Sequence, residues 1–398
     1  MVKRLEDELL LCCSRTCIGA ETTEQIRTLL QKEIDWAYLI QIAFKHGTVP
    51  LLYQSLNVTC PEALPKAVLD ELRRHFHANA LRNHFLTGEL LKLLTQFEVH
   101  GIPVLPFKGP ALAASAYGNL ALRQFCDLDI LVHEQDVLRA KDLLISQGYQ
   151  PLYHLTGAEE AAYILSHGQY PFGRDYGKIS VELHWRILEP PFPFPLDIEC
   201  LWERLEPISL AGKTILTFSP EDLLLILCAH GTKSRWARLE WICCVAEHVR
   251  VHQEMDWGWV MQQASASRSE RMLFLGLLLA SDLLGTTLPN EILQRIQADV
   301  VIKSLSVRVQ ERLFREREAD GRLGRFKTNA FVLEYIKRFI FLFRASESRA
   351  GHIARHFPYF LLRVVTTPTS KGRTLLPLRV LFSFLDYLIR LTQLDRDR

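Results

Sequence analysis

The stretch PFKGPALAASAYGNLALRQFCDLDILV, Pro106–Val132, contains the features that decide the fold. A Lys-Gly-Pro turn follows the short apolar run IPVLPF, residues 102–107, and precedes a segment of helical composition. The stretch ends in the apolar run LDILV, Leu128–Val132. The pattern predicts a strand, a turn, a helix and a second strand. Asp127 and Asp129 stand within this second strand, where burial favours Val and Ile.

A third strand is predicted at KISVELHW, residues 178–185, where polar and apolar residues alternate strictly. Strand side chains point alternately to two faces, so Asp127 and Asp129 share one face of their strand. Glu182 and His184 share the polar face of the later strand for the same reason. If the two strands are neighbours, three carboxylates converge on one spot.

Three converging carboxylates repel one another in a partly desolvated site unless a cation neutralises them. Hard oxygen ligands select Mg²⁺ or Mn²⁺, which bind through a few carboxylates and substrate phosphates. The alternative is a pair of half-exposed strands with ordinary solvated acids, the usual meaning of an isolated D-x-D. The aligned third acid favours a metal site made by Asp127, Asp129 and Glu182.

The Lys108-Gly109-Pro110 turn is a candidate phosphate site. A strand, a Gly turn and a helix start expose backbone N–H groups at the positive end of a helix, which suits phosphate. Pro110 is favourable at the first helical position. Lys108 adds a point charge, and Arg123 offers a bidentate phosphate contact. Each signal alone is also compatible with an ordinary turn and a surface arginine.

These residues resemble a known family. FKGPALAASAYGNLALRQFCDLDILV followed by GKISVELHW is similar to the bacterial uncharacterised nucleotidyltransferase family, within the polymerase-β-like nucleotidyltransferase superfamily. The superfamily signature is a Gly turn that opens a helix, a D-x-D on a strand and a third acid on a later strand. It falls on Gly109, on Asp127 with Asp129, and on Glu182. EIDWAYLIQIAFKHGTVPLLYQSL upstream and LCAHGTKSRWARLEWICCVAEH downstream also resemble the family.

The resemblance implies metal-assisted transfer of a nucleoside monophosphate from a nucleoside triphosphate (NTP) to an acceptor. Asp127 and Asp129 would hold Mg²⁺ or Mn²⁺ on the triphosphate and, with Glu182, a second ion at the acceptor oxygen. Glu182 would also accept the acceptor's proton. Lys108 and Arg123 would neutralise phosphate charge. The acceptor is unidentified: a small molecule, a sugar or a peptide, as for accessory proteins of biosynthetic clusters.

Three positions depart from the family pattern. Gly109-Pro110 stands where the superfamily has Gly-Gly or Gly-Ser, which removes one backbone donor. Cys244 stands where an Asp is usual, and Ser234 where a His is common. These departures leave a second interpretation open, a non-catalytic nucleotide- or peptide-binding accessory protein that keeps the fold. A third interpretation, a helical scaffold with fortuitous acids, predicts that the three acids lie far apart.

Several further polar residues are candidates for substrate contact. His184 either orients the acceptor, holds the carboxylate of Glu182 or is a structural histidine. His230 ends an apolar helix, where acceptor contact competes with a role as a cation at the helix C-terminus. His167 and Arg174 lie in a predicted loop before the Glu182 strand, at the position for a lid.

The predicted fold class is α+β. A small mixed-sheet nucleotidyltransferase core at 96–190 lies between mainly helical regions at 1–95 and 191–398. The helical pattern before the core includes Thr22–Gly47, which ends on a glycine. The Pro-rich run EPPFPFPLD, Glu189–Asp197, is the predicted boundary, after which the chain is expected to return to helices almost to its end.

Composition limits the classes of partner. The hydrophobic content of 48% and charged content of 23% are those of a globular protein. The net charge of +2 comes with scattered basic residues, so no nucleic-acid-binding arm is evident. Acidic residues near the N-terminus argue against a signal peptide. The longest apolar run, Met272–Gly285, is interrupted by Asp282 and too short to span a membrane, so a cytoplasmic protein is expected.

Two further patterns are compatible with ordinary packing. The segment LLPLRVLFSFLDYLIRL, residues 375–391, predicts an amphipathic helix for which packing is favoured over lipid contact. Nine cysteines include no C-x-x-C pair, which indicates reduced thiols rather than a zinc site.

Overall fold

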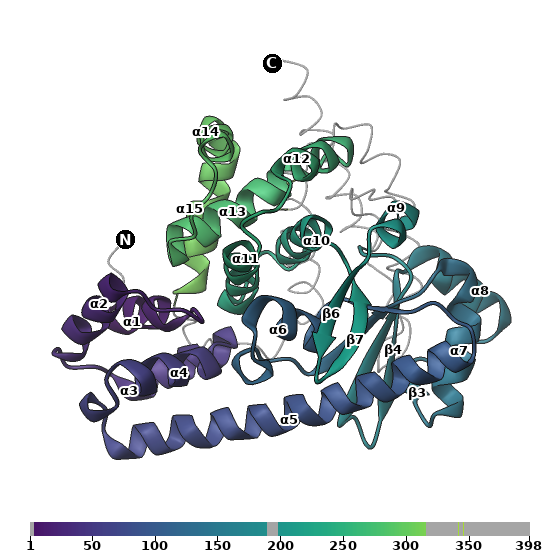
Figure 1. Ribbon diagram of the computed structural model, residues 1–398, viewed down its shortest axis with the longest axis horizontal. Helices are drawn as coiled ribbons and strands as arrows, with labels where there is room; N and C mark the ends of the chain where they lie inside the picture. The colour runs from purple at the N-terminus through teal and green to yellow at the C-terminus, as the bar shows by residue number, and fades with distance from the viewer. Residues whose placement is uncertain (1–3, 189–197, 316–340, 342–344, 346–398) are drawn as a thin grey trace, which may run out of the picture.

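The computed structural model describes residues 4–188 and 198–315, together with Phe341 and Ala345. Over these residues the chain forms a helical region and an α+β region that lie side by side (Figure 1). The Pro-rich boundary predicted at Glu189–Asp197 and the helix predicted at 375–391 lie outside the described residues. No helix in the described part of the chain is long and apolar enough to cross a membrane.

Five α-helices precede the first strand in the described part of the chain. They are α1 (Leu5–Cys13), α2 (Ala20–Leu30), α3 (Trp36–His46), α4 (Val49–Thr59) and α5 (Lys66–Val99). The helical pattern predicted over Thr22–Gly47 is interrupted between α2 and α3, and α3 ends at Gly47 as predicted, with a left-handed φ of 70°. Helix α5 has 34 residues and runs beneath both regions of the molecule (Figure 1).

A five-stranded mixed sheet forms the centre of the α+β region. Its order is β1 (Leu105–Pro106), β2 (Asp127–Leu131), β5 (Ile179–His184), β4 (Gln169–Arg174) and β3 (Gln150–Pro151). Strands β2 and β5 pair in parallel, and the other neighbours pair antiparallel. Helices α6 (Gly109–Tyr117), α7 (Val137–Ser146) and α8 (Gly157–Ser166) connect the strands. The predicted α+β class with a small mixed sheet is confirmed.

Three sequence predictions about the strands are wrong. The strand expected at 102–107 is reduced to Leu105–Pro106, because prolines cannot donate to a ladder. The loop expected around Arg174 is the end of β4, whose alternation is masked by Pro171 and Gly173. A hairpin of β6 (Glu206–Leu210) and β7 (Lys213–Thr217) interrupts the region expected to be helical.

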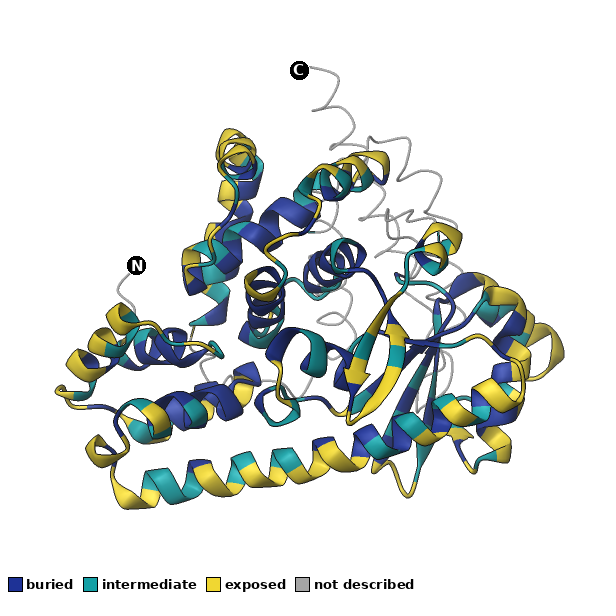
Figure 2. Cartoon of the chain, viewed as in Figure 1, coloured by how far each residue is buried: buried dark blue, intermediate teal, exposed yellow. Residues whose placement is uncertain are grey.

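Helices form the rest of the described chain. They are α9 (Ile198–Glu203), α10 (Pro220–Lys233), α11 (Leu239–Val251), α12 (Trp257–Ala266), α13 (Glu270–Leu284), α14 (Asn290–Ala298) and α15 (Val300–Leu313). The buried face of α10 and the whole middle of α13 are dark in Figure 2, which marks them as the centre of the helical region. All nine cysteines are free thiols.

Buried apolar side chains form two clusters. One fills the helical region and extends to Phe107 and Leu112 beside the sheet. The other lies between the sheet, α5 and α7, and includes Leu128, Ile130 and Val181. One face of β2 and β5 is therefore apolar and covered, and the opposite face turns toward α6 and the helical region. The polar side chains of both strands lie on that second face.

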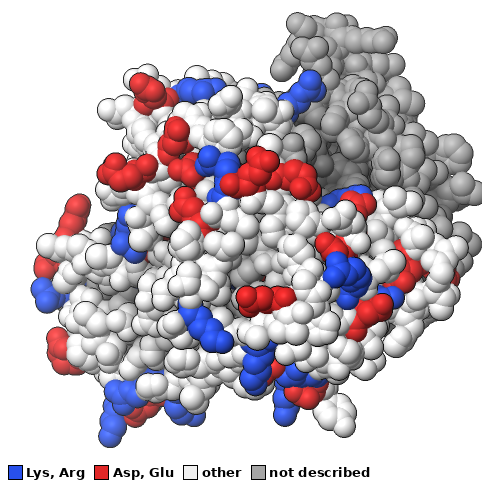
Figure 3. Space-filling model, turned by 45° about the vertical axis from the view of Figure 1, so that its right-hand side comes forward, with Lys and Arg blue, Asp and Glu red and all other residues white. Residues whose placement is uncertain are grey.

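Charged side chains are mixed on the face of the molecule seen in Figure 3. Basic side chains occur there singly or in small groups among acidic ones. Scattered charges of both signs give no extended surface for a polyanion.

Candidate functional site

Asp129 and Glu182 lie side by side on neighbouring parallel strands. The register pairs Asp129 with Glu182, and Asp127 with Ser180. The condition set by the sequence analysis, that the two strands are neighbours, is met, and the acids of both strands lie on one face. The interpretation of a helical scaffold with widely separated acids is wrong for this pair.

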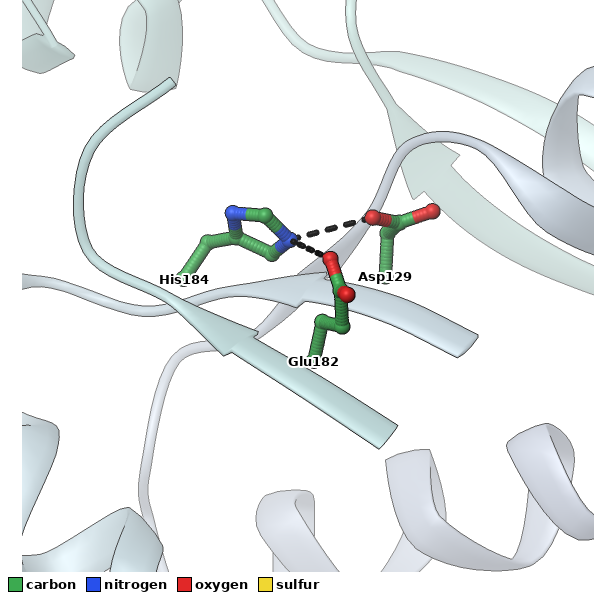
Figure 4. A group of neighbouring side chains, drawn as sticks. All are labelled: Asp129, Glu182 and His184. Carbon is green, nitrogen blue, oxygen red and sulfur yellow. Dashed lines mark hydrogen bonds and ion pairs between the residues drawn. The ribbon is translucent and has the colours of Figure 1, made fainter. Parts of the chain in front are cut away.

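Three possible ligand groups converge on this face of the sheet. Asp129, Glu182 and His184 each offer one atom within 4.8 Å of the other two. The Nε2 atom of His184 lies 3.0 Å from Oδ1 of Asp129 and 3.4 Å from Oε2 of Glu182 (Figure 4). The side chains of Asp129 and His184 are buried, whereas that of Glu182 is 27% exposed, so the group opens to solvent at Glu182. Asp127 is half-buried and is not part of this group.

Lys108 reaches the same carboxylate from the turn before α6. Its Nζ donates a hydrogen bond of 2.9 Å to Oδ1 of Asp129. The ring of Phe107 lies 5.0 Å from this ammonium and contacts the His184 ring edge-on at 5.2 Å. The Asp129 carboxylate therefore lies between the Lys108 ammonium and the His184 imidazole, and the Phe107 ring packs against both of these groups.

Electrostatics separate the two aspartates of the D-x-D. Burial alone would raise the pKa of Asp129, but Lys108 and the hydrogen bond from His184 hold it well below its usual range. Burial, together with the charges of Asp129 and Glu182, raises the pKa of Asp127 to about 6. Asp129 is thus firmly ionised at neutral pH. The negative charge of Asp127 is compensated less well by the protein than that of Asp129. An added cation would stabilise the ionised form of Asp127.

The Lys108-Gly109-Pro110 turn touches β2 through the backbone. Gly109 opens α6 with a left-handed φ of 48°. A Cβ atom at Gly109 would lie 3.2 Å from the carbonyl oxygen of Asp127. The turn therefore brings the positive end of a helix directly beside the carboxylate strand. Strand, turn and helix follow one another as the sequence predicted, and the phosphate site itself stays a prediction.

We expect Gly109→Ala to destabilise the protein more than Gly118→Ala, although both glycines, at the start of α6 and just after its end, have left-handed conformations. Each substitution costs about 1–2 kcal/mol for the backbone conformation. Only Gly109→Ala adds a clash with the Asp127 carbonyl, because nothing lies within 4 Å of a Cβ at Gly118. Urea unfolding of the two variants measures the difference. Equal stabilities would show that the turn and β2 are not in close contact.

Arg123 lies behind the turn. Its Nη1 donates to the carbonyl oxygen of Gly109 at 3.4 Å, and its Nε donates to Sγ of Cys244 at 3.4 Å. Tyr117 Oη donates to the same sulfur at 3.4 Å. Within the described part of the chain, Arg123 forms no ion pair with a carboxylate. Because Cys244 stands where the family resemblance leads us to expect an Asp, the hydrogen-bond partners of the guanidinium are a thiol and a backbone carbonyl oxygen.

Two asparagines of α5 hold the loop that carries Arg123, and the sequence prediction missed both. Asn83 Nδ2 donates to the carbonyl oxygens of Leu120 at 2.6 Å and Arg123 at 2.7 Å. Asn79 Nδ2 donates to Ala121 at 2.9 Å and more weakly to Arg123 at 3.4 Å. The two asparagines lie one helical turn apart on the inner face of α5. Polar residues at this spacing on an otherwise apolar face were the signal available in the sequence.

The other polar residues singled out in the sequence occupy structural positions. His167 ends α8 and stacks on Tyr163 with ring centroids 3.9 Å apart. Arg174 forms an ion pair with Glu89 of α5, which ties β4 to that helix. His230 packs edge-on against Trp241 at 5.7 Å. Burial and the charge of Lys108 lower the pKa of His230 well below its usual value, so this imidazole is neutral beside the site.

Glu240 is a second confined acid near the site, in the first turn of α11. Its Oε1 lies 3.1 Å from Nη1 of Arg238, and its side chain is 14% exposed. The carboxylate packs directly against Gly47 at the end of α3, where a Cβ would clash with it. Burial raises the pKa of Glu240 to about 7, although Arg238 and Arg123 oppose the shift.

Glu240 makes stability depend on pH. Its folded pKa of about 7 lies above the reference value of 4.5, so the folded state binds a proton that the unfolded state releases between these values. The stability contribution is fully present below pH 4.5 and is lost as the pH rises through about 7. We expect Glu240→Gln to remove this loss, which amounts to about 3 kcal/mol.

Urea unfolding of wild type and Glu240→Gln at acidic and alkaline pH measures this effect. Glu62→Gln, at an exposed position in the 3₁₀-helix at 61–63, is the control and should follow wild type. Parallel pH profiles for Glu240→Gln and wild type would show that Glu240 titrates as an ordinary surface acid.

The fold and the site together define a class. The sheet is mixed, its paired carboxylates lie on neighbouring parallel strands, and a Gly turn places a helix N-terminus beside them. This arrangement is the core of a nucleotidyltransferase fold. The chain belongs to the uncharacterised nucleotidyltransferase family, whose model matches residues 32–285, more than half of its length.

Two solved structures are also similar to parts of the chain. One is ANT(2")-Ia in complex with adenylyl-2"-tobramycin, with 13% identity, 46% of this chain and 97% of that chain covered, and a TM-score of 0.32. The other is an antigenic nucleotidyltransferase-like protein from Paracoccidioides brasiliensis, with 16% identity, coverage of 51% and 93%, and a TM-score of 0.31. Neither similarity is close enough to indicate a substrate. No match was found among curated proteins.

Proposed function

We propose that the protein transfers a nucleoside monophosphate from an NTP to an acceptor with the help of Mg²⁺ or Mn²⁺. The observation that carries this proposal is the lateral pairing of Asp129 with Glu182 on parallel strands. Like charges placed side by side on a sheet are destabilising unless something compensates them. Lys108 and His184 compensate them in part, and Asp127 adds a further acid nearby.

The residues present fit a divalent cation. Asp129 and Glu182 supply oxygen donors, Glu182 faces solvent, and Asp127 adds an acid whose pKa is raised by burial and by the charges of Asp129 and Glu182. Hard carboxylate oxygens are the donors that Mg²⁺ and Mn²⁺ prefer. Asp127, Asp129 and Glu182 are the proposed metal ligands. A cation bound there would stabilise negative charge on the attacking and leaving oxygens.

Lys108, Gly109 and Arg123 form the proposed phosphate site. Helix α6 begins at Gly109, and the positive end of its dipole favours negative charge there. The Arg123 guanidinium lies against the same turn without a carboxylate partner in the described chain. Lys108 is bonded to Asp129, and a cation at that carboxylate would free its ammonium for phosphate. These groups stabilise the charge of the triphosphate and of the departing pyrophosphate.

In the proposed reaction, an acceptor hydroxyl attacks the α-phosphorus of the NTP. A new oxygen–phosphorus bond forms, the bond between the α-phosphorus and its bridging oxygen to the β-phosphate breaks, and pyrophosphate leaves with that electron pair. Glu182 is the proposed acceptor of the hydroxyl proton, because its carboxylate is the most exposed of the three donor groups. Nε2 of His184 lies 3.0 Å from Asp129 and 3.4 Å from Glu182, so the imidazole helps to hold both carboxylates in place.

The acceptor is a small molecule, a sugar or a peptide, and a biosynthetic cluster is the proposed context. Because the reaction consumes NTP, the proposal places the protein in the cytoplasm. The alternative is a binding protein that retains the nucleotidyltransferase fold without turnover. It is favoured by the contact between Cys244 and Arg123, where a carboxylate is expected from the family resemblance.

The proposal is tested with NTPs labelled at either the α- or the γ-phosphate. The protein is incubated with each NTP, a divalent cation and a fractionated lysate as the source of acceptor. Nucleotidyl transfer predicts that label from the α-position enters an acceptor and label from the γ-position appears only in pyrophosphate. Label from the γ-position in the acceptor would indicate phosphoryl transfer instead. Binding of NTP without label transfer or pyrophosphate release would support the non-catalytic alternative.

A further inference from the structure

His184 is placed differently from an ordinary structural histidine of a strand. It is the last residue of β5 and lies on the same face as Glu182, two positions later. Its Nε2 lies between the two carboxylates, 3.0 Å from one and 3.4 Å from the other. Figure 4 shows the same nitrogen directed at both acids. The edge of the Phe107 ring confines the imidazole from the side, at 5.2 Å between centroids.

The spacing of these atoms matches the ligands of one metal ion. Adjacent ligands of an octahedral ion with bonds of about 2.1 Å are about 3 Å apart. The separations of 3.0 Å and 3.4 Å between Nε2 and the two carboxylate oxygens agree with this edge length. All three donor atoms lie within 4.8 Å of one another. The nitrogen and the two oxygens are thus able to share one cation with little movement.

We propose that His184 supplies a nitrogen ligand to the cation held by Asp129 and Glu182, so that the site binds Mn²⁺ in preference to Mg²⁺. The inference rests on the proposed function, because it concerns the cation of that site. Mg²⁺ keeps oxygen ligands and gives up its water reluctantly. Imidazole suits transition metals, and among these Mn²⁺ also suits carboxylate and phosphate oxygens. A donor set of two carboxylates and one imidazole therefore favours Mn²⁺ over Mg²⁺.

The opposing arrangement is also defined by the structure. In it, Nε2–H of His184 donates to both carboxylates, and the cation is held by carboxylate oxygens alone. His184 would then be a positioning residue, and the nitrogen would not touch the metal. Mn²⁺ distinguishes the two arrangements, because a directly bonded nitrogen couples magnetically to its unpaired electrons.

The test uses Mn²⁺ alone as the probe on the full chain. Pulsed electron paramagnetic resonance of the loaded protein should show coupling to one histidine nitrogen. Growth with ¹⁵N-labelled histidine should convert this signal to the ¹⁵N pattern, a result that needs no mutation. His184→Asn should abolish the coupling, whereas His167→Asn, at a buried histidine outside the donor group, should keep it.

Competition titrations give a second readout. Wild type is expected to bind Mn²⁺ at least ~10-fold more tightly than Mg²⁺, and His184→Asn should lose most of that preference. Bound Mn²⁺ without histidine coupling, or coupling that persists in His184→Asn, would overturn the inference and leave the carboxylate site standing. Failure of wild type to bind either cation would overturn both this inference and the metal site of the proposed function.

Discussion

Asp129→Asn is expected to lower nucleotidyl transfer by roughly 10³-fold, because several kcal/mol of charge stabilisation by a cation is lost with its ligand. The carboxylate is buried and lies within hydrogen-bond distance of Lys108 and His184, at the centre of the donor group. The substitution keeps the shape of the side chain and removes only its charge. Release of pyrophosphate from NTP in the presence of the acceptor fraction measures the effect.

Asp136→Asn is the matched control for this prediction. Asp136 is also buried and pairs with Arg139, but it lies outside the donor group. Its substitution should change stability without a comparable loss of turnover. Circular dichroism separates the two effects by showing whether each variant is folded. A folded Asp129→Asn protein with wild-type turnover would remove the catalytic role of the D-x-D.

Lys108→Met should lower the free energy of unfolding by about 3 kcal/mol in metal-free protein, because it breaks a buried ion pair and leaves Asp129 ionised. The two side chains are only 14% and 4% exposed, so water cannot replace the lost ammonium. Saturating Mn²⁺ should restore much of the loss, because the cation binds the same carboxylate in the folded state only. Urea unfolding with EDTA and with Mn²⁺ measures both numbers.

The double variant Lys108→Met/Asp129→Asn provides the control. With both charges removed, its loss of unfolding free energy should be smaller than the sum of the losses of the two single variants. Mn²⁺ should no longer stabilise it. Additive losses would show that Lys108 and Asp129 act independently. A Lys108→Met protein that is as stable as wild type in EDTA would show that the contact of 2.9 Å contributes nothing.

Strand periodicity was enough to predict the central part of the site. Alternation placed Asp129 and Glu182 on the polar faces of their strands, and the parallel register then set them opposite each other. The sequence also indicated the Gly109 turn, because a glycine before a proline and an Ala-rich segment predicts a helix start. What alternation did not reveal was the neighbour of each strand, which depends on packing across the whole sheet.

The parts that sequence reasoning missed depend on contacts between distant segments. Asn79 and Asn83 come from a helix that looks merely amphipathic, and their role appears only where the loop before β2 crosses α5. Strand β4 was not predicted, because Pro171 and Gly173 interrupt the alternation of polar and apolar residues. Both have a low strand propensity, which the pairing of β4 with β5 overrides. The hydrogen bond between Arg123 and Cys244 connects residues that are 121 positions apart, and no local sequence pattern predicts such a contact.

The most direct test of the site is a crystal structure with Mn²⁺ and an NTP analogue that resists cleavage between the α- and β-phosphates. Anomalous scattering locates manganese independently of the protein atoms. We predict manganese bonded to the carboxylates of Asp127, Asp129 and Glu182 and to triphosphate oxygens, with those phosphates against the N-terminus of α6 at Gly109. Manganese or nucleotide bound away from these carboxylates would contradict the account.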